Sequence, residues 1–244
     1  MTMLIRLLKA ERLKLRRSPV WLAFLLMPVL PAILGTLNYL GNIEILSSEW
    51  YSLWTQHTLF TDYFFLPIML GIYCSYIMHQ EHLNHNWNKL FSMPVGRANI
   101  FLAKLISASG MVLLSEAWIG ALFLISGYVL GMSGPPLGSL AIWCLFGTLG
   151  GVVMAAIQLT LSMFIKSFAL PVGIAFAGGL SGLVFLSKHL GHVWPYSLMA
   201  YGMNSNSPQE LIKSGYAQFV IICTAYIAVF TIFGSVVASR KEMG

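Results

Sequence analysis

Long stretches without a charged side chain are the feature that most constrains the fold of this chain. Residues 18–43 and 117–165 contain no Asp, Glu, Lys or Arg, and the chain of 244 residues is 57% hydrophobic and only 9% charged. A soluble domain of this size needs far more charge to cover its surface. In a bilayer, helices pair their own backbone groups. The sequence therefore predicts an all-α, polytopic membrane protein.

The positions of the charges and turns divide the chain into spans, each of which needs about 20 apolar residues to cross a bilayer. The turn sequence GMSGPP (131–136) splits the longest apolar run. We predict one transmembrane domain over residues 1–244, with loops at about 41–60, 80–97 and 188–215. The predicted transmembrane helices are 19–40, 62–79, 105–130, 138–163, 168–187 and 216–238.

The basic residues predict the orientation of these spans. If both termini lie in the cytoplasm, only Lys188 and Lys213 of the 14 Lys and Arg residues lie outside. Basic residues concentrate on the cytoplasmic side of membrane proteins. We therefore expect cytoplasmic N- and C-termini, a cytoplasmic loop at 80–97 and an extracellular loop at 188–215. The net charge of +6 then reports orientation, and no basic soluble face remains for a nucleic-acid partner.

The N-terminal sequence MLIRLLKAERLKLRR (3–17) is amphipathic. Leu4, Leu8 and Leu15 share a stripe and the basic residues lie mostly opposite, which predicts a helix lying on the cytoplasmic leaflet. Glu11 falls on the leucine stripe, so it needs a partner. That partner is either Lys14, three residues on, or a contact with loop 80–97 or a cytoplasmic protein. The candidate interfacial residues are Arg6, Lys9, Glu11 and Lys14.

The loop QEHLNHNWNKLFSMPVGR (80–97) concentrates hydrogen-bonding side chains in an apolar chain. Leu83, Trp87 and Leu90 have helical spacing, which predicts a short amphipathic helix on the membrane surface.

Histidines recur at 79, 82 and 85, but this spacing spreads them around a helix rather than gathering them for a metal. The three cysteines lie in separate apolar runs and indicate buried side chains. We expect no bound metal.

Three segments resemble a known family: LLKAERLKLRRSP (7–19), EWYSLWTQHTLFTDYFFLPIMLGIY (49–73) and EHLNHNWNKLFSMPVGRANIFLAKL (81–105). They resemble the ABC-2-type transporter permeases, and more narrowly the permeases that protect bacteria from lantibiotics and related bacteriocins. The resemblance implies a permease in the bacterial plasma membrane that partners an ABC ATPase, in two copies, and a second permease subunit, identical or related. It also implies a peptide substrate.

In that family the first cytoplasmic loop carries a coupling helix that docks on the ATPase, and the N-terminal helix also faces the ATPase. Carried over to this sequence, the docking role falls on Glu81, His82, Asn84, Asn86, Trp87, Asn88 and Lys89. The chain contains no GxxxxGK[ST] phosphate loop. We therefore expect a transport subunit without catalytic residues or a cofactor of its own, with ATP and Mg²⁺ bound by the partner chain.

Other functions remain open. The same architecture could carry a lipid, a polysaccharide precursor or a small drug, or the chain could be a non-transporting scaffold or sensor subunit. An intramembrane hydrolase would need a nucleophile with a base, or a metal cluster, at membrane depth.

Glu116 is the acid that lies well inside a predicted span. It could contact a cationic substrate, hold two permeases together, or form a structural hydrogen bond to a neighbour such as Gln158. The glycine-rich sequences GTLGG (147–151) and AGGLSG (177–182) predict close packing between helices.

Overall fold

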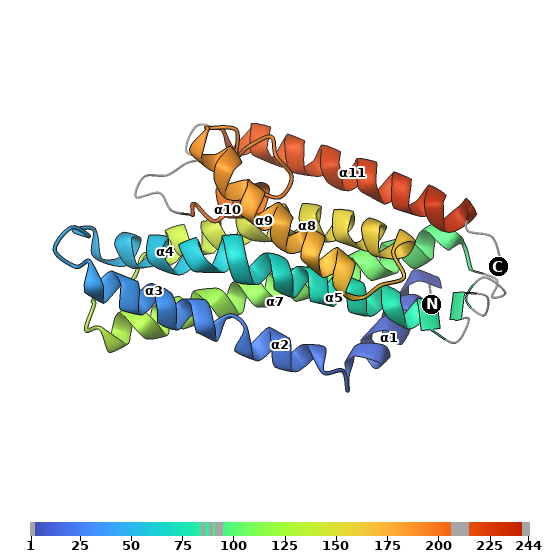
Figure 1. The fold of residues 1–244 in the computed structure, drawn as a ribbon, viewed down its shortest axis with the longest axis horizontal. Helices are drawn as coiled ribbons and strands as arrows, with labels where there is room; N and C mark the ends of the chain where they lie inside the picture. The colour runs from blue at the N-terminus through green and yellow to red at the C-terminus, as the bar shows by residue number, and fades with distance from the viewer. Residues whose placement is uncertain (1–2, 84–85, 88–89, 91–94, 206–214, 241–244) are drawn as a thin grey trace.

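The protein is an elongated bundle of helices in the computed structural model, which describes residues 3–83, 86–87, 90, 95–205 and 215–240 (Figure 1). The described residues form helices and no strand. The helices are α1 Met3–Leu15, α2 Val20–Leu26, α3 Val29–Gly41, α4 Glu49–Phe60, the π-helix η1 Thr61–Phe65, α5 Leu66–His82, α7 Arg97–Val129, α8 Leu137–Phe164, α9 Ala169–Ser187, α10 Leu198–Gly202 and α11 Tyr216–Arg240.

The described residues contain 6 helical segments long and apolar enough to cross a membrane, which confirms the predicted all-α polytopic fold. These segments are Val20–Gly41, Glu49–His82, Ala98–Val129, Leu137–Phe164, Ala169–Ser187 and Tyr216–Ala238. The predicted turn separates the third and fourth, with Gly131 and Gly134 at φ of 77° and 66°. Helix α1 and the last turns of α11 lie at the same end of the bundle (Figure 1).

The first segment is broken between α2 and α3. Pro28 lies at the break and precedes the first residue of α3. Proline has no N–H to donate to the preceding turn, and its ring crowds the carbonyl four residues earlier. The expected span at 19–40 is therefore two shorter helices that meet at a kink.

The predicted loop at 41–60 is wrong over its second half, because α4 begins at Glu49 and continues through η1 into α5. Trp50 and Trp54 have exposed fractions of 3% and 0%. The Trp54 indole stacks on Trp143 with 5.3 Å between ring centroids, and it meets the edge of Phe123 at 4.9 Å. Both tryptophans fall within the predicted loop, where they would lie at the level of the lipid headgroups. They are instead core residues, because their aromatic partners come from α7 and α8.

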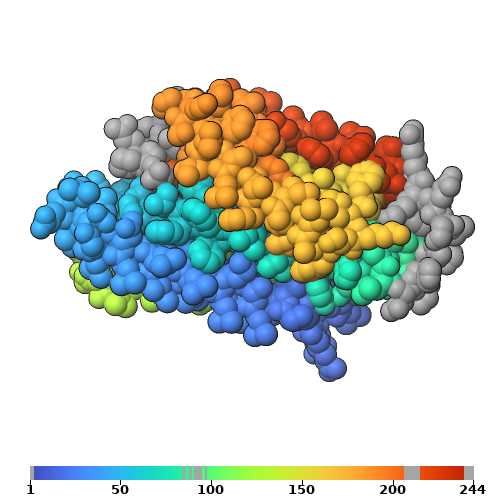
Figure 2. Space-filling view, viewed as in Figure 1, coloured from blue at the N-terminus to red at the C-terminus, as the bar shows by residue number. Residues whose placement is uncertain are grey.

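The π-helix lies where α9 packs against the second segment. Pro67, at the start of α5, has no N–H, and the wider π turn before it accommodates the missing hydrogen bond. A Cβ at Gly179 of α9 would lie 2.9 Å from the Tyr63 carbonyl oxygen and 2.5 Å from the Pro67 Cγ. Glycine therefore lets α9 lie directly on this turn, and α9 covers the near face of the bundle in Figure 2.

The predicted extracellular loop at 188–215 is partly wrong, because α10 folds back onto α8. Leu198 and Met199 at its start have exposed fractions of 0% and 1%. A Cβ at Gly150 of α8 would lie 2.5 Å from the Leu198 carbonyl carbon, and one at Gly202 would lie 2.4 Å from the Phe146 carbonyl oxygen. The predicted close packing at the glycine-rich sequence GTLGG is thus confirmed. Residues 206–214 of this loop lie outside the described residues.

Candidate functional site

Four charged side chains meet at the end of the bundle where α1 lies, and we call Glu11, Lys14, Glu81 and Lys104 the ion cluster. The Lys14 ammonium lies 3.1 Å from the Glu11 carboxylate and 2.5 Å from that of Glu81. The Lys104 ammonium lies 3.0 Å from Glu11 and 2.7 Å from Glu81. Each cation thus contacts both anions, and the formal charges of the cluster sum to zero.

The ion cluster joins three elements that are distant in sequence. Glu11 and Lys14 lie on the inner face of α1, Glu81 lies at the end of α5, and Lys104 lies two turns into α7. The Lys104 side chain is fully buried, and the two carboxylates are nearly so, whereas the Lys14 side chain is 34% exposed. Burial alone would lower the pKa of Lys14, but the carboxylates of Glu11 and Glu81 outweigh burial and raise it. Lys14 therefore stays charged at physiological pH.

The ion cluster can hold the three helices in fixed relative positions rather than catalyse a reaction. A buried ion pair contributes little net stability, because desolvation offsets the Coulomb attraction, but losing one partner leaves an unpaired buried charge. The segment between Glu81 and Lys104 contains the predicted cytoplasmic loop. Both ends of that loop are therefore held to α1, and α1 cannot move away from α5 or α7 without separating charges.

Both alternatives for Glu11 are present in the structure. Glu11 pairs with Lys14 on its own helix, and through Lys14 and Lys104 it also reaches Glu81 beside the loop. The sequence did not identify Lys104 as a member of a site. Lys104 only marked the boundary of the predicted span that begins at residue 105. The helix extends from Arg97, so Lys104 lies inside it. The available signal was a lysine near the start of a helix that becomes apolar further along.

The predicted docking residues divide into two groups. Glu81 is only 3% exposed, so it serves the ion cluster instead of a protein surface in this conformation. The His82 ring lies 2.9 Å from the Ser162 carbonyl oxygen, and the Trp87 indole N–H donates to His82 at 3.2 Å. The Asn86 amide donates to the Gln80 carbonyl at 2.8 Å. Asn84, Asn88 and Lys89 lie outside the described residues.

The loop does not form the predicted amphipathic face in full. Trp87 is 8% exposed and Leu90 packs on the core, but Leu83 is 47% exposed. Leu83 has extended backbone (ψ 146°), so α5 ends at His82 and the helical spacing is lost there. Asn86 and Trp87 lie back against the end of α5, where the Trp87 ring is 5.9 Å from the His82 ring between centroids.

The histidines do not gather for a metal in the described part of the chain. His79 packs against Phe168 with 6.0 Å between ring centroids, while His82 contacts Ser162 and Trp87. His85 lies outside the described residues. Among residues that are described, no three His, Cys, Asp or Glu side chains lie close enough to hold a metal ion. Arg6 and Lys9 are exposed on α1.

A second polar group lies within the membrane-spanning region. The Glu116 side chain is fully buried, and a Cβ at Gly147 would lie 3.1 Å from its carboxylate. Neither carboxylate oxygen of Glu116 has a hydrogen-bond partner among the described residues. Gln158, one of the alternative partners named for Glu116, instead donates to the Tyr196 hydroxyl at 2.9 Å. The enclosed Glu116 reaches neither lipid nor a subunit surface in this conformation.

Asp62 is a buried acid that sequence analysis used only to mark a span boundary. It lies in η1 with 1% of its surface exposed and accepts a hydrogen bond from the Ser205 hydroxyl, just after α10. A Cβ at Gly147, next to the Glu116 carboxylate, would also lie 2.4 Å from the Cγ of Met203, two residues before Ser205. The two carboxyl groups thus lie in the same interior region, which α10 closes. The sequence TDYFF, in which one acid interrupts an aromatic run, was the available signal.

Residues 7–182 match the family described as ABC-2 family transporter protein. The matched range covers well over half of the chain and includes the ion cluster, the predicted cytoplasmic loop and both buried acids. No curated protein matches the chain.

Proposed function

This chain belongs to the ABC-2 family of transporter proteins, and we infer that it is the permease subunit of an ATP-driven exporter. Family membership and the apolar helices make it a multi-pass protein of the bacterial plasma membrane. The energy would come from a separate ABC ATPase, in two copies, that binds ATP and Mg²⁺. A second permease subunit, identical or related, would complete the transport path.

The ion cluster is the observation that supports this function best. An exporter must carry the movement of a docked ATPase into its membrane helices. Loop 80–97 leaves the bundle at the end of α5 and returns at the start of α7, and Glu81 and Lys104 tie these two helices to α1. A force applied to the loop would therefore move α1, α5 and α7 together, because separating buried charges is costly.

The coupling role of the loop is tested with Trp87→Ala. The indole anchors the loop to the end of α5 through His82, so its loss should uncouple the ATPase while the bundle stays inserted. The protein is purified in mild detergent, and we expect a nucleotide-binding subunit to co-purify with wild type but not with the variant. Substrate-stimulated ATP hydrolysis should fall in parallel.

A matched control is Trp118→Ala, which removes a partly buried indole of α7 that donates to the Leu25 carbonyl at 3.2 Å and has no contact with the loop among the hydrogen bonds of the described residues. It should leave co-purification unchanged. If Trp87→Ala retains both the partner and stimulated hydrolysis, the loop is not the coupling element. If wild type purifies with no ATPase at all, the exporter proposal itself is wrong.

We propose a lantibiotic or similar cationic, amphipathic peptide as the cargo. The support is the resemblance of residues 49–105 to permeases that protect bacteria from such peptides, together with the two acids inside the bundle, Asp62 and Glu116. Cells that lack the gene should become more sensitive to at least one peptide in a lantibiotic panel. Unchanged sensitivity to every peptide, with a working ATPase complex, would favour a lipid, polysaccharide-precursor or drug cargo.

A further inference from the structure

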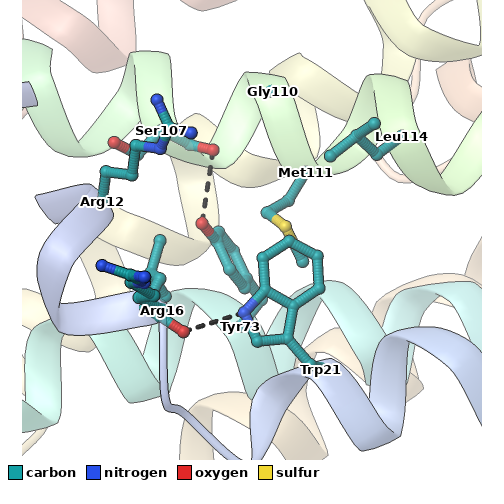
Figure 3. A pocket seen from close by; sticks show the side chains of 9 residues that line it. Arg12, Arg16, Trp21, Tyr73, Ser107, Gly110, Met111 and Leu114 are labelled. Carbon is teal, nitrogen blue, oxygen red and sulfur yellow. Dashed lines mark hydrogen bonds between the residues drawn. The ribbon is translucent and has the colours of Figure 1, made fainter.

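A hollow of about 550 Å³ lies between α1, α2, α5 and α7, beside the ion cluster but separate from it. Figure 3 shows two arginines of α1 on one side of the hollow, with α2 and α7 supplying apolar side chains on the other. The residues that the argument uses are Arg12, Arg16, Trp21, Tyr73, Met111 and Leu114.

The two arginines supply positive charge that the described protein does not neutralise. Both are exposed, and within the described ranges the ion pairs of α1 involve only Glu11 and Lys14. Arg16 directly follows the last residue of α1, and its N–H donates to the Arg12 carbonyl at 3.0 Å. The helical turn therefore continues to Arg16, and the two side chains lie on the same face. They also line a second hollow of about 510 Å³ together with Lys9. Guanidinium groups in this arrangement suit a phosphate, which they can bind through paired hydrogen bonds.

The opposite wall of the hollow is apolar. The two large side chains with a polar group have partners: the Trp21 indole N–H donates to the Leu15 carbonyl at 2.8 Å, and the Tyr73 hydroxyl donates to the Ser107 carbonyl at 3.3 Å. Leu114 is 49% exposed, and the neighbouring Leu25 of α2 is 48% exposed. The wall is therefore continuous with the lipid-facing surface of α2 and α7, and a hydrocarbon chain can enter from the bilayer.

We propose that this hollow binds an anionic phospholipid of the leaflet at the α1 end of the bundle. The lipid phosphate lies between Arg12 and Arg16, and one acyl chain lies against Trp21, Met111 and Leu114. Basic pockets between helices at the cytoplasmic surface suit such headgroups. The lipid then holds the outer face of α1 to the membrane, while the ion cluster holds its inner face to α5 and α7. This proposal does not depend on the cargo or on the ATPase.

Lipid binding to the purified full-length chain tests the proposal, by native mass spectrometry with phosphatidylglycerol and phosphatidylethanolamine as separate probes. We expect wild type to prefer phosphatidylglycerol. Arg12→Gln with Arg16→Gln should weaken its binding about 25-fold, since each basic residue near a membrane surface contributes about fivefold. Arg17→Gln is the matched control, because Arg17 is exposed at the same end of α1 but does not line the hollow; it should bind as wild type.

A second variant tests the apolar wall with every charge retained. Gly110 lines the hollow, and a Cβ there would meet nothing within 4 Å, so Gly110→Leu should fill the space without disturbing the helix. Gly173→Leu is its control, because a Cβ on that α9 residue also meets nothing within 4 Å. Gly110→Leu should lose phosphatidylglycerol, and Gly173→Leu should keep it, with similar melting temperatures.

Three results would overturn the proposal. The first is unchanged phosphatidylglycerol binding in both the arginine double variant and Gly110→Leu. The second is equal binding of phosphatidylethanolamine and phosphatidylglycerol by wild type. The third is full displacement of the lipid by excess inorganic phosphate, which would make the hollow a site for free phosphate rather than for lipid.

Discussion

At the scale of single residues, Lys104 is the side chain whose neighbours matter most. It is fully buried in α7, and its charge is satisfied by Glu11 and Glu81 at 3.0 and 2.7 Å. Lys14 contacts the same two carboxylates but is 34% exposed. The two lysines thus make the same ion pairs at different depths, which allows a direct comparison of buried and half-exposed charge.

We expect Lys104→Met to lower the free energy of unfolding by about 3–5 kcal/mol, because it leaves two buried carboxylates with one shared cation. Lys14→Met should cost about 1 kcal/mol or less, because Lys14 is 34% exposed and water can reach the carboxylates on that side once the lysine is removed. Thermal unfolding of the detergent-solubilised protein measures both. Combining Lys104→Met with Glu81→Leu should restore part of the loss, since one cation and one anion remain. Equal melting temperatures for the two lysine variants would contradict the prediction.

At the scale of elements, α10 depends on glycine in α8. Gly150→Ala would place a Cβ 2.5 Å from the backbone of Leu198 and Met199, so α10 must shift. Such overpacking costs about 1–3 kcal/mol. In a background without the native cysteines, a cysteine at Ala200, which is 1% exposed, should resist a membrane-impermeant maleimide but react once Gly150→Ala is added. Gly173→Ala should leave it protected, and labelling that Gly150→Ala does not change would show that α10 is not held by this contact.

The elements also show what the sequence could predict. The apolar spans can be predicted from local composition, because a run without charged residues can lie in the hydrocarbon core of the bilayer whichever helices pack against it. The helices α4 and α10 were assigned to loops, because Trp50, Trp54 and Tyr201 suit a headgroup region as well as a core. Their burial depends on Phe123, Trp143 and the α8 glycines, which are distant in sequence. Only half of the ion cluster could be predicted, because only half of it is local in sequence. Glu11 and Lys14 are three residues apart, whereas Glu81 and Lys104 join them only through the fold.

At the scale of the whole molecule, the fold separates two chemically different ends. The α1 end carries the ion cluster and the arginines of the hollow, and the far end carries the turns between α3 and α4 and between α7 and α8 (Figure 1). Basic residues favour the cytoplasmic side, so the α1 end should face the cytoplasm. The lipid site, the ion cluster and the loop then lie on the side where an ATPase has access to ATP.

This orientation is tested with single cysteines at two exposed positions, in a background without the native cysteines. Ile45 lies in the α3–α4 turn and is 78% exposed, and Leu13 lies on α1 and is 68% exposed. A membrane-impermeant maleimide should label Ile45→Cys on intact cells, and should label Leu13→Cys only after the membrane is permeabilised. Both sites are open to water or headgroups, so a difference in labelling reports the side of the membrane and not burial. The reverse pattern would place the loop and the ion cluster outside the cell, where no ATP-driven partner could act on them.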